Sequence, residues 1–281
     1  MASESGFNPI LHVADAHEFE IFHHVNVHIP FGITKFEILI LAAAIVIFVA
    51  YTWLAKKVAT GETPRGRLWN FLEMLLIFIR DQVARPSIGE HEYKRFLPYL
   101  WTTFLFILVL NLFGMIPFLG SATASLAVTI VLAGISFAVV QVNGIRANHG
   151  FGGYMKSFIP HIEFGTSPVM KVLGFFMMAG MFVLEILSML IRSVVLAVRL
   201  FANMLAGHTA LVVVLSFIMM AGNAAAHGSS EASIFFWPIT FSSVVMVLLL
   251  NLLELFVACL QAFIFTFLTA IFIGLAIHPQ H

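Results

Sequence analysis

Charged residues are scarce in this chain. Only 10% of its 281 residues are Asp, Glu, Lys or Arg, whereas soluble domains carry about 25%. The formal net charge is zero, and nothing in the charge pattern suggests binding to nucleic acid. The chain is instead 60% apolar, with 30 Phe residues and a mean hydropathy of +1.00. This composition is typical of a helical protein that crosses a membrane several times.

Cysteine and metal-binding patterns are also scarce. The single Cys259 lies in an apolar stretch, cannot form an internal disulfide, and is predicted to be a small core residue. The polar N-terminal segment, 1–34, is rich in histidine, but the spacing fits no tight ligand set, so neither a metal nor a cofactor is predicted. No basic region precedes an apolar run there, which argues against a cleaved signal peptide. The chain has no GxxxxGK[ST] motif for binding a nucleotide.

A single membrane domain is predicted over residues 35–277, followed by a short tail at 278–281. Three apolar runs are each long enough to cross the hydrocarbon core. They lie at about 36–57, 97–119 and 122–142. Residues 65–83 carry charges between apolar stripes and predict an amphipathic helix on the membrane surface. Residues 143–168 are rich in Gly and predict a loop.

The last two apolar runs, at about 169–221 and 234–277, are too long for ordinary spans. A continuous helix of about 45 residues would reach about 68 Å, roughly twice the hydrocarbon thickness. Each run is therefore either two spans with a tight turn or one long, tilted helix. Because no cluster of Gly, Pro and Asn breaks either interior, long helices are favoured. The predicted fold is an all-α polytopic membrane protein with vertical spans, one surface helix and a hairpin of two long tilted helices.

Three charged residues interrupt the apolar stretch between about 172 and 226: Glu185, Arg192 and Arg199. An Arg within a membrane costs roughly 2.5–3.5 kcal/mol on insertion scales, so it usually faces a bundle interior or a wet cavity. Because a guanidinium keeps its charge, Arg199 is suited to hold and release a carboxylate rather than to carry a proton. The spacing of seven places all three on one helix face, and Asn203 extends this stripe.

A second polar set is predicted on other helix faces. His208 follows Arg199 by nine residues and therefore lies on the opposite face of the same helix. In the last run, Glu254 and Gln261 share a face, and Asn251 lies one turn before Glu254. Single polar residues in membrane helices often only hydrogen-bond neighbouring helices. The combination of two titratable groups, a fixed cation and amides instead favours an ion pathway.

Two of these segments resemble a known family. RLFANMLAGH, at 199–208, closely resembles a signature of the a subunit of F-type ATP synthases, and LQAFIFTFLT, at 260–269, resembles the second. NLFGMIP, at 111–117, and Glu185 also fit, so the resemblance covers roughly residues 35–277. It implies a stator subunit that is not catalytic alone and that couples proton flow to rotation and ATP synthesis. It implies no cofactor.

The resemblance also implies roles and partners. Arg199 would face the carboxylates of a rotating c-subunit ring, and two offset half-channels would load and unload protons. The residues implied for the outer half-channel are Asn203, His208, Glu254 and Gln261. Asn251 is predicted to lie beside the same proton route, next to His208 and Glu254. Glu185 would lie near the cytoplasmic exit. The other implied partners are b-type peripheral-stalk subunits, the soluble ATPase sector through the complex, and the lipid bilayer.

This chain differs from many bacterial members of that family, in which the positions of His208 and Glu254 hold Glu and His respectively. The exchange of both together predicts that the two side chains meet, or share a water, between the helices. In another departure, Gly114 stands where some bacterial members have Asp. Two rival classes are a secondary transporter with a substrate-binding Arg, although no internal repeat is evident, and a structural scaffold, which needs no such polar set.

The basic residues predict the orientation. Eight of the fourteen Lys and Arg residues lie between 56 and 95, three lie between 143 and 171, and none follows Arg199. Both basic segments are therefore predicted to be cytoplasmic, with the N-terminus outside and the C-terminus inside. The expected location is a bacterial inner membrane, because no basic amphipathic presequence occurs, with the mitochondrial inner membrane as the alternative.

Overall fold

The computed structural model describes residues 18–20, 26–28, 35–59, 66–116, 121–148, 150–157, 168–226 and 230–277. Apart from two strands of three residues each, the elements in this part of the chain are helices. Five of them are long and apolar enough to cross a membrane. They are α1 (Lys35–Ala59), α4 (Tyr93–Gly114), α5 (Leu126–Ala147), α7 (Pro168–Ala226) and α8 (Ser230–Ile277). The predicted class of an all-α polytopic membrane protein is confirmed.

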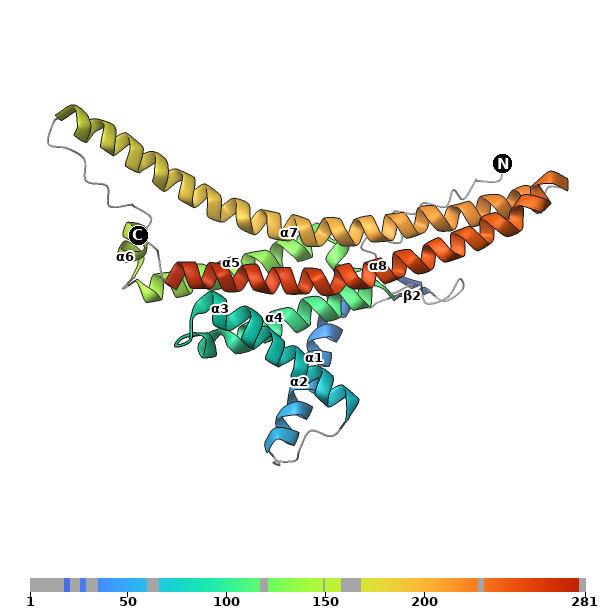
Figure 1. The fold of residues 1–281 in the computed structure, drawn as a ribbon, viewed down its shortest axis with the longest axis horizontal. Helices are drawn as coiled ribbons and strands as arrows, with labels where there is room; N and C mark the ends of the chain where they lie inside the picture. Colours follow the sequence, from blue (N-terminus) through green and yellow to red (C-terminus); the bar gives the residue numbers. More distant parts are fainter. Residues whose placement is uncertain are drawn as a thin grey trace. The chain divides into compact units, whose positions relative to one another are not determined.

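The two longest apolar runs each form one continuous helix. Figure 1 shows α7, of 59 residues, and α8, of 48 residues, without a break into separate spans. At 1.5 Å per residue they extend for about 88 Å and about 72 Å, more than twice the thickness of a hydrocarbon core. A helix of this length fits a bilayer only if it is tilted or extends beyond it, so the tilt remains a prediction from length.

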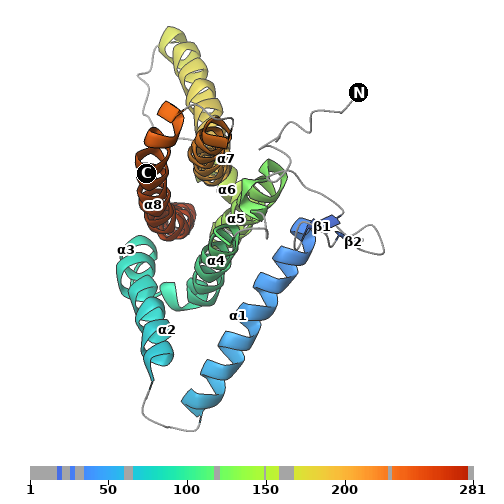
Figure 2. The same ribbon diagram turned by 90° about the vertical axis from the view of Figure 1, so that its right-hand side faces the viewer.

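The chain divides into two compact units, each assembled from three stretches of sequence. The first unit comprises residues 1–53, 105–128 and 199–262, and the second unit comprises residues 54–104, 129–198 and 263–281. The described strands, β1 (Glu18–Glu20) and β2 (Asn26–His28), pair antiparallel within the first unit. They lie beside each other in Figure 2. The rest of the polar N-terminal segment lies outside the described residues.

In the first unit, small residues allow close packing at the end of α4. A Cβ atom on Gly114 would lie 2.7 Å from the Ser121 hydroxyl oxygen and 3.1 Å from the Met204 methyl carbon. The Ser121 hydroxyl is also 3.2 Å from the Thr123 hydroxyl, in the 3₁₀ helix η3 (Ala122–Ala124), and all these groups are buried. The glycine at 114 therefore lets a pair of hydroxyl groups pack over the helix end.

In the second unit, an interrupted helix occupies the region predicted as a surface helix over 65–83. It consists of α2 (Arg67–Phe78), a π-helical turn, η2 (Ile79–Ala84), and α3 (Arg85–Ile88). One side is buried through Ile79, Val83, Ala84 and Ile88, whereas the other exposes large apolar residues of α2 together with charged groups. That this helix lies on the membrane surface stays a prediction from the sequence.

The expectation of a loop over residues 143–168 was wrong in part. Helix α5 continues to Ala147, a further helix, α6, spans Phe151–Ser157, and α7 begins at Pro168. Gly150 adopts a φ of 107°, a conformation that glycine tolerates best, and its carbonyl accepts the Tyr154 amide at 3.0 Å. The frequent glycines in this segment had suggested a loop, but Tyr154 is buried and anchors the short helix.

Candidate functional site

The first unit contains a pair of neighbouring titratable side chains, one buried and one half-buried. The His208 Nε2 atom of α7 lies 3.9 Å from the Glu254 Oε1 atom of α8, with side-chain exposures of 18% and 4%. This proximity confirms the prediction drawn from their joint exchange. At 3.9 Å the contact is too long for a hydrogen bond. None of His208 Nε2, Glu254 Oε1 and Glu254 Oε2 has a hydrogen-bond partner among the described residues.

Helical periodicity explains why these two side chains meet. On α7, Leu200, Met204 and His208 are spaced by four, and the first two are almost fully buried, so the stripe packs into the first unit. Gly207 leaves room for the carboxylate, because a Cβ at this position would lie 2.9 Å from Glu254 Oε1. The site is therefore shaped by one glycine and by a regular helix face.

Amide side chains extend the site along α8. Asn111 of α4 is fully buried, and its Nδ2 donates to the backbone carbonyl of Ala258, one turn after Glu254, at 3.2 Å. The Asn111 Oδ1 atom has no hydrogen-bond partner among the described residues. Gln261 is buried on α8, and Asn251 is half-buried. Buried polar atoms without protein partners are usually satisfied by ordered water, so this region is suited to hold water.

In the sequence, Asn111 stands out only as the first residue of NLFGMIP, one of the segments that resemble the family. Its contact with α8 joins residues 147 positions apart in the chain, and a periodic pattern within one helix carries no signal for such a contact. The only available signal was an amide in an apolar span, which is equally typical of simple helix packing.

Arg199 lies on another side of α7. Its side chain and that of Asn203 are half-buried, whereas Ala202 and Ala206 are exposed. Residues spaced by three, four and seven share a helix face, so the guanidinium is flanked by small residues. Within the described part of the chain, Arg199 forms no ion pair and no hydrogen bond. The structure thus keeps the fixed charge apart from the pair of titratable side chains.

Two further charged residues of α7 belong to the second unit. Arg192 is exposed, and its guanidinium carbon lies 5.6 Å from the centre of the Phe272 ring. The helical backbone includes Glu185, but its side chain lies outside the described residues. That Glu185, Arg192 and Arg199 share one face of α7 therefore follows only from their spacing along the helix.

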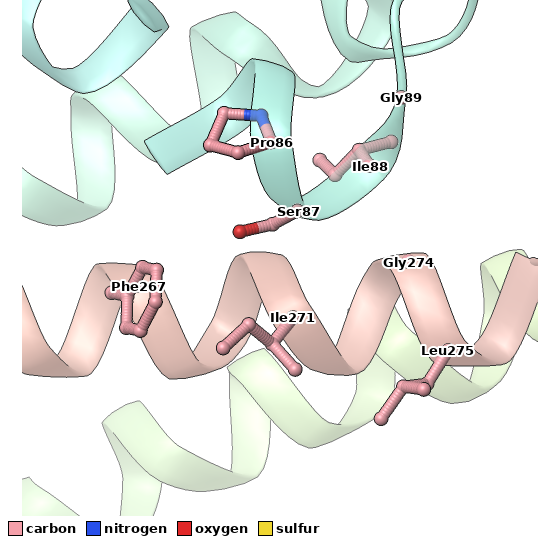
Figure 3. A pocket seen from close by; sticks show the side chains of 8 residues that line it. All are labelled: Pro86, Ser87, Ile88, Gly89, Phe267, Ile271, Gly274 and Leu275. Atoms are coloured by element: carbon pink, nitrogen blue, oxygen red, sulfur yellow. The ribbon is translucent and has the colours of Figure 1, made fainter. Parts of the chain in front are cut away.

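A separate pocket of about 410 Å³ lies within the second unit, between α3 and the end of α8 (Figure 3). Apolar side chains and backbone line most of it, and Ser87 supplies the sole polar side chain of the lining. A Cβ atom on Gly274 would overlap the backbone carbonyl oxygen of Ser87. The lining has no charged group that could bind a phosphate or a carboxylate. Among the described residues, no group of three or more His, Cys, Asp or Glu could hold a metal.

These observations define a class: a polytopic membrane protein that keeps titratable groups and a fixed cation inside its membrane domain. Comparison with known proteins gives the family. Residues 37–274 match the ATP synthase A chain family. The chain belongs to that family, whose members are ion-translocating subunits of a membrane sector, and it is not an enzyme on its own.

Several bacterial relatives carry the name ATP synthase subunit a. The chain is 37% identical over 250 residues to that of Myxococcus xanthus, which covers 89% of this chain and 74% of the relative. It is also 37% identical over 284 residues to the subunit a of Chloroherpeton thalassium. That alignment covers 97% of this chain and 77% of the relative. The relative from Anaeromyxobacter dehalogenans is 40% identical over 234 residues, and this chain spans 55% of its length. These matches support a multi-pass bacterial membrane protein with a proton-translocating role.

Proposed function

We propose that this chain is the stator subunit that transfers protons to and from the carboxylates of a rotating c-subunit ring. Two half-channels, offset along the subunit, connect the ring to opposite sides of the membrane. The observation that carries the proposal is the separation within the first unit: the His208–Glu254 pair, with a buried carboxylate, on one side of α7, and a half-buried Arg199 without an ion pair among the described residues on another. Titratable groups can relay protons, whereas the guanidinium cannot.

Protons enter from outside through the region of His208, Glu254 and Asn251, with Asn203 and Gln261 further along the path. Support comes from the unsatisfied polar atoms of His208, Glu254 and Asn111, which water would bridge within the first unit. A carboxylate with a neighbouring imidazole at 3.9 Å can accept a proton from one water and return it to another. The proton then neutralises a ring carboxylate.

Arg199 acts as the electrostatic barrier between the two half-channels. Its permanent charge repels a proton that would cross directly and attracts an ionised carboxylate of the ring. Ala202 and Ala206, exposed beside it, would let a partner helix approach closely, as small residues do between membrane helices. Once protonated, the ring carboxyl can rotate through lipid without the cost of a buried charge.

The second half-channel leads to the cytoplasm near Glu185, where the ring carboxyl loses its proton after nearly a full turn. Each elementary charge that crosses 100 mV supplies about 2.3 kcal/mol, so several protons are required for each ATP. The soluble ATPase sector performs the phosphoryl chemistry, and b-type peripheral-stalk subunits hold this chain against the rotation. The N-terminus lies outside and the C-terminus inside a bacterial inner membrane, an orientation that the distribution of Lys and Arg favours.

Substitution of Arg199 in the assembled complex tests the proposal. Arg199→Lys should abolish coupled ATP synthesis, and Arg199→Ala should let protons leak through vesicles that retain the membrane sector after the soluble sector is removed. Arg192→Ala is the matched control, because Arg192 lies seven residues earlier on the same helix and is exposed. Synthesis that persists in the Lys variant, or a proton-tight membrane with the Ala variant, would contradict the role of Arg199.

A further inference from the structure

The second unit contains a polar pair that the proposed function has not used. The Tyr154 hydroxyl of α6 donates to the Gln141 Oε1 atom of α5 at 2.8 Å, and Tyr154 is only 3% exposed. Gln141 lies within the span Leu126–Ala147, where an uncharged amide still costs free energy unless it is hydrogen-bonded. The bond links the short helix α6 to the cytoplasmic end predicted for this span.

The pair also contacts α7. The Gln141 Nε2 atom lies 3.5 Å from the Met189 sulfur, and the Tyr154 hydroxyl oxygen lies 3.9 Å from it. Met189 follows Glu185 by four residues and precedes Arg192 by three, so the three positions share one face of α7. The Ser193 hydroxyl donates to the Met189 carbonyl at 3.3 Å and adds a further polar group at this level.

Close packing holds the pair in place. A Cβ atom on Gly144 would lie 2.6 Å from the Tyr154 ring, so the glycine allows the ring to lie against α5. The Asn148 side chain donates both to the Gly144 carbonyl, at 2.8 Å, and to the Ala276 carbonyl of α8, at 3.1 Å. These contacts fix the end of α5 against α6 and α8 within the second unit.

Packing alone does not use the full hydrogen-bonding capacity of Gln141. Its carbonyl oxygen has two lone pairs and its amide nitrogen has two N–H groups. Among the described residues, one lone pair accepts Tyr154 and one N–H meets a sulfur, which is a weak acceptor. Because the side chain is only half-buried, the remaining N–H and lone pair are available to water.

We propose that Gln141 and Tyr154 line the cytoplasmic proton route beside the Glu185 position. The hydroxyl and the amide hold water in a fixed orientation next to the α7 face that carries Glu185, so that a proton released by the ring passes along a prearranged hydrogen-bond chain. Neither group ionises in this role, and each water that takes up a proton passes one on. The inference rests on the proposed function, because it assigns further residues to the same exit path.

Two variants of the assembled complex test this inference. Tyr154→Phe removes the hydroxyl and keeps the ring, and Gln141→Met removes the amide and keeps the length. The measurement is passive proton conductance in vesicles that retain the membrane sector without the soluble sector, normalised to the amount of assembled ring. Each variant should lower the conductance by about two- to tenfold, the factor expected for the loss of one hydrogen bond.

Tyr99→Phe is the matched control. The Tyr99 hydroxyl of α4 donates to Ser136 of α5, the helix that carries Gln141, at 3.0 Å, and no hydrogen bond joins Tyr99 to α7 among the described residues. Its loss tests whether removal of any tyrosine hydroxyl that is hydrogen-bonded to α5 affects conductance. The inference predicts unchanged conductance for this control, and an equal loss in the control would overturn it.

Glu185→Gln separates this inference from the proposed function. If Glu185→Gln lowers conductance but Tyr154→Phe and Gln141→Met do not, the two residues are only packing groups and the inference fails. If Glu185→Gln itself leaves conductance unchanged, the proposed exit path fails. Should Tyr154→Phe prevent assembly, Gln141→Met alone decides, because its apolar chain fits beside a sulfur.

Discussion

Exchange of His208 and Glu254 should reveal how strongly the two side chains are coupled. At 3.9 Å, an imidazolium and a carboxylate attract each other by about 4 kcal/mol in an environment of intermediate dielectric. His208→Glu places two acids at this distance, and Glu254→His places two imidazoles there. Each single variant loses the acid–base pair and leaves two groups whose charges repel each other whenever both are ionised, whereas the double exchange restores an acid beside a base.

The measured quantity is ATP-driven proton pumping in membrane vesicles for the parent, both single variants and the double variant. Groups in contact usually show interaction energies of about 0.5–3 kcal/mol in such a cycle. We expect a coupling of roughly 1–3 kcal/mol, so the double variant should retain about 5- to 150-fold more activity than the two single losses predict together. The complex must assemble equally in all four forms. Losses that simply add would refute functional contact between the two side chains.

Two further predictions concern a glycine and a surface carboxylate. Gly207→Ala should displace the Glu254 carboxylate, because a Cβ at this position would lie 2.9 Å from Oε1. It should lower proton pumping severalfold while the complex assembles normally. Gly180→Ala is the control and should leave pumping unchanged, because a Cβ there meets nothing within 4 Å. Equal pumping in both variants would contradict this. The hydrogen bond from Arg80 lowers the pKa of Asp81, so its small stabilisation is present at neutral pH and is lost as the pH falls through that lowered pKa. The difference in thermal unfolding midpoint between the parent complex and Asp81→Asn should therefore shrink on acidification. A difference that grows as the pH falls would contradict the stabilising contribution assigned to the ionised Asp81.

Much of the architecture could be predicted from periodicity and composition. The length of the apolar runs and the lack of breaks indicated two long helices, because a helix continues where nothing stops it. The meeting of His208 and Glu254 was predicted from their joint exchange, which is information about a pair rather than about a single helix. The roles assigned to these residues stay predictions.

Other features depend on contacts between distant parts of the chain. The burial of Tyr154 stabilises helix α6, whereas the surrounding glycines predict a loop. The π-helical turn at Ile79–Ala84 rests on a local choice of hydrogen bond that the apolar pattern does not encode. Asn111 bonds to the Ala258 carbonyl, and backbone carbonyls occur at every residue, so sequence carries no signal for this partner.

A density map of the assembled complex tests the central claim most directly. The proposed role of Arg199 predicts that its guanidinium faces a carboxylate of the ring at about 4–6 Å. Opposite charges strongly influence each other over this range. Water density should approach it from the His208–Glu254 side and, separately, from the cytoplasmic side. An Arg199 side chain that points to lipid headgroups or bulk solvent, with no acidic partner beside it, would contradict the account.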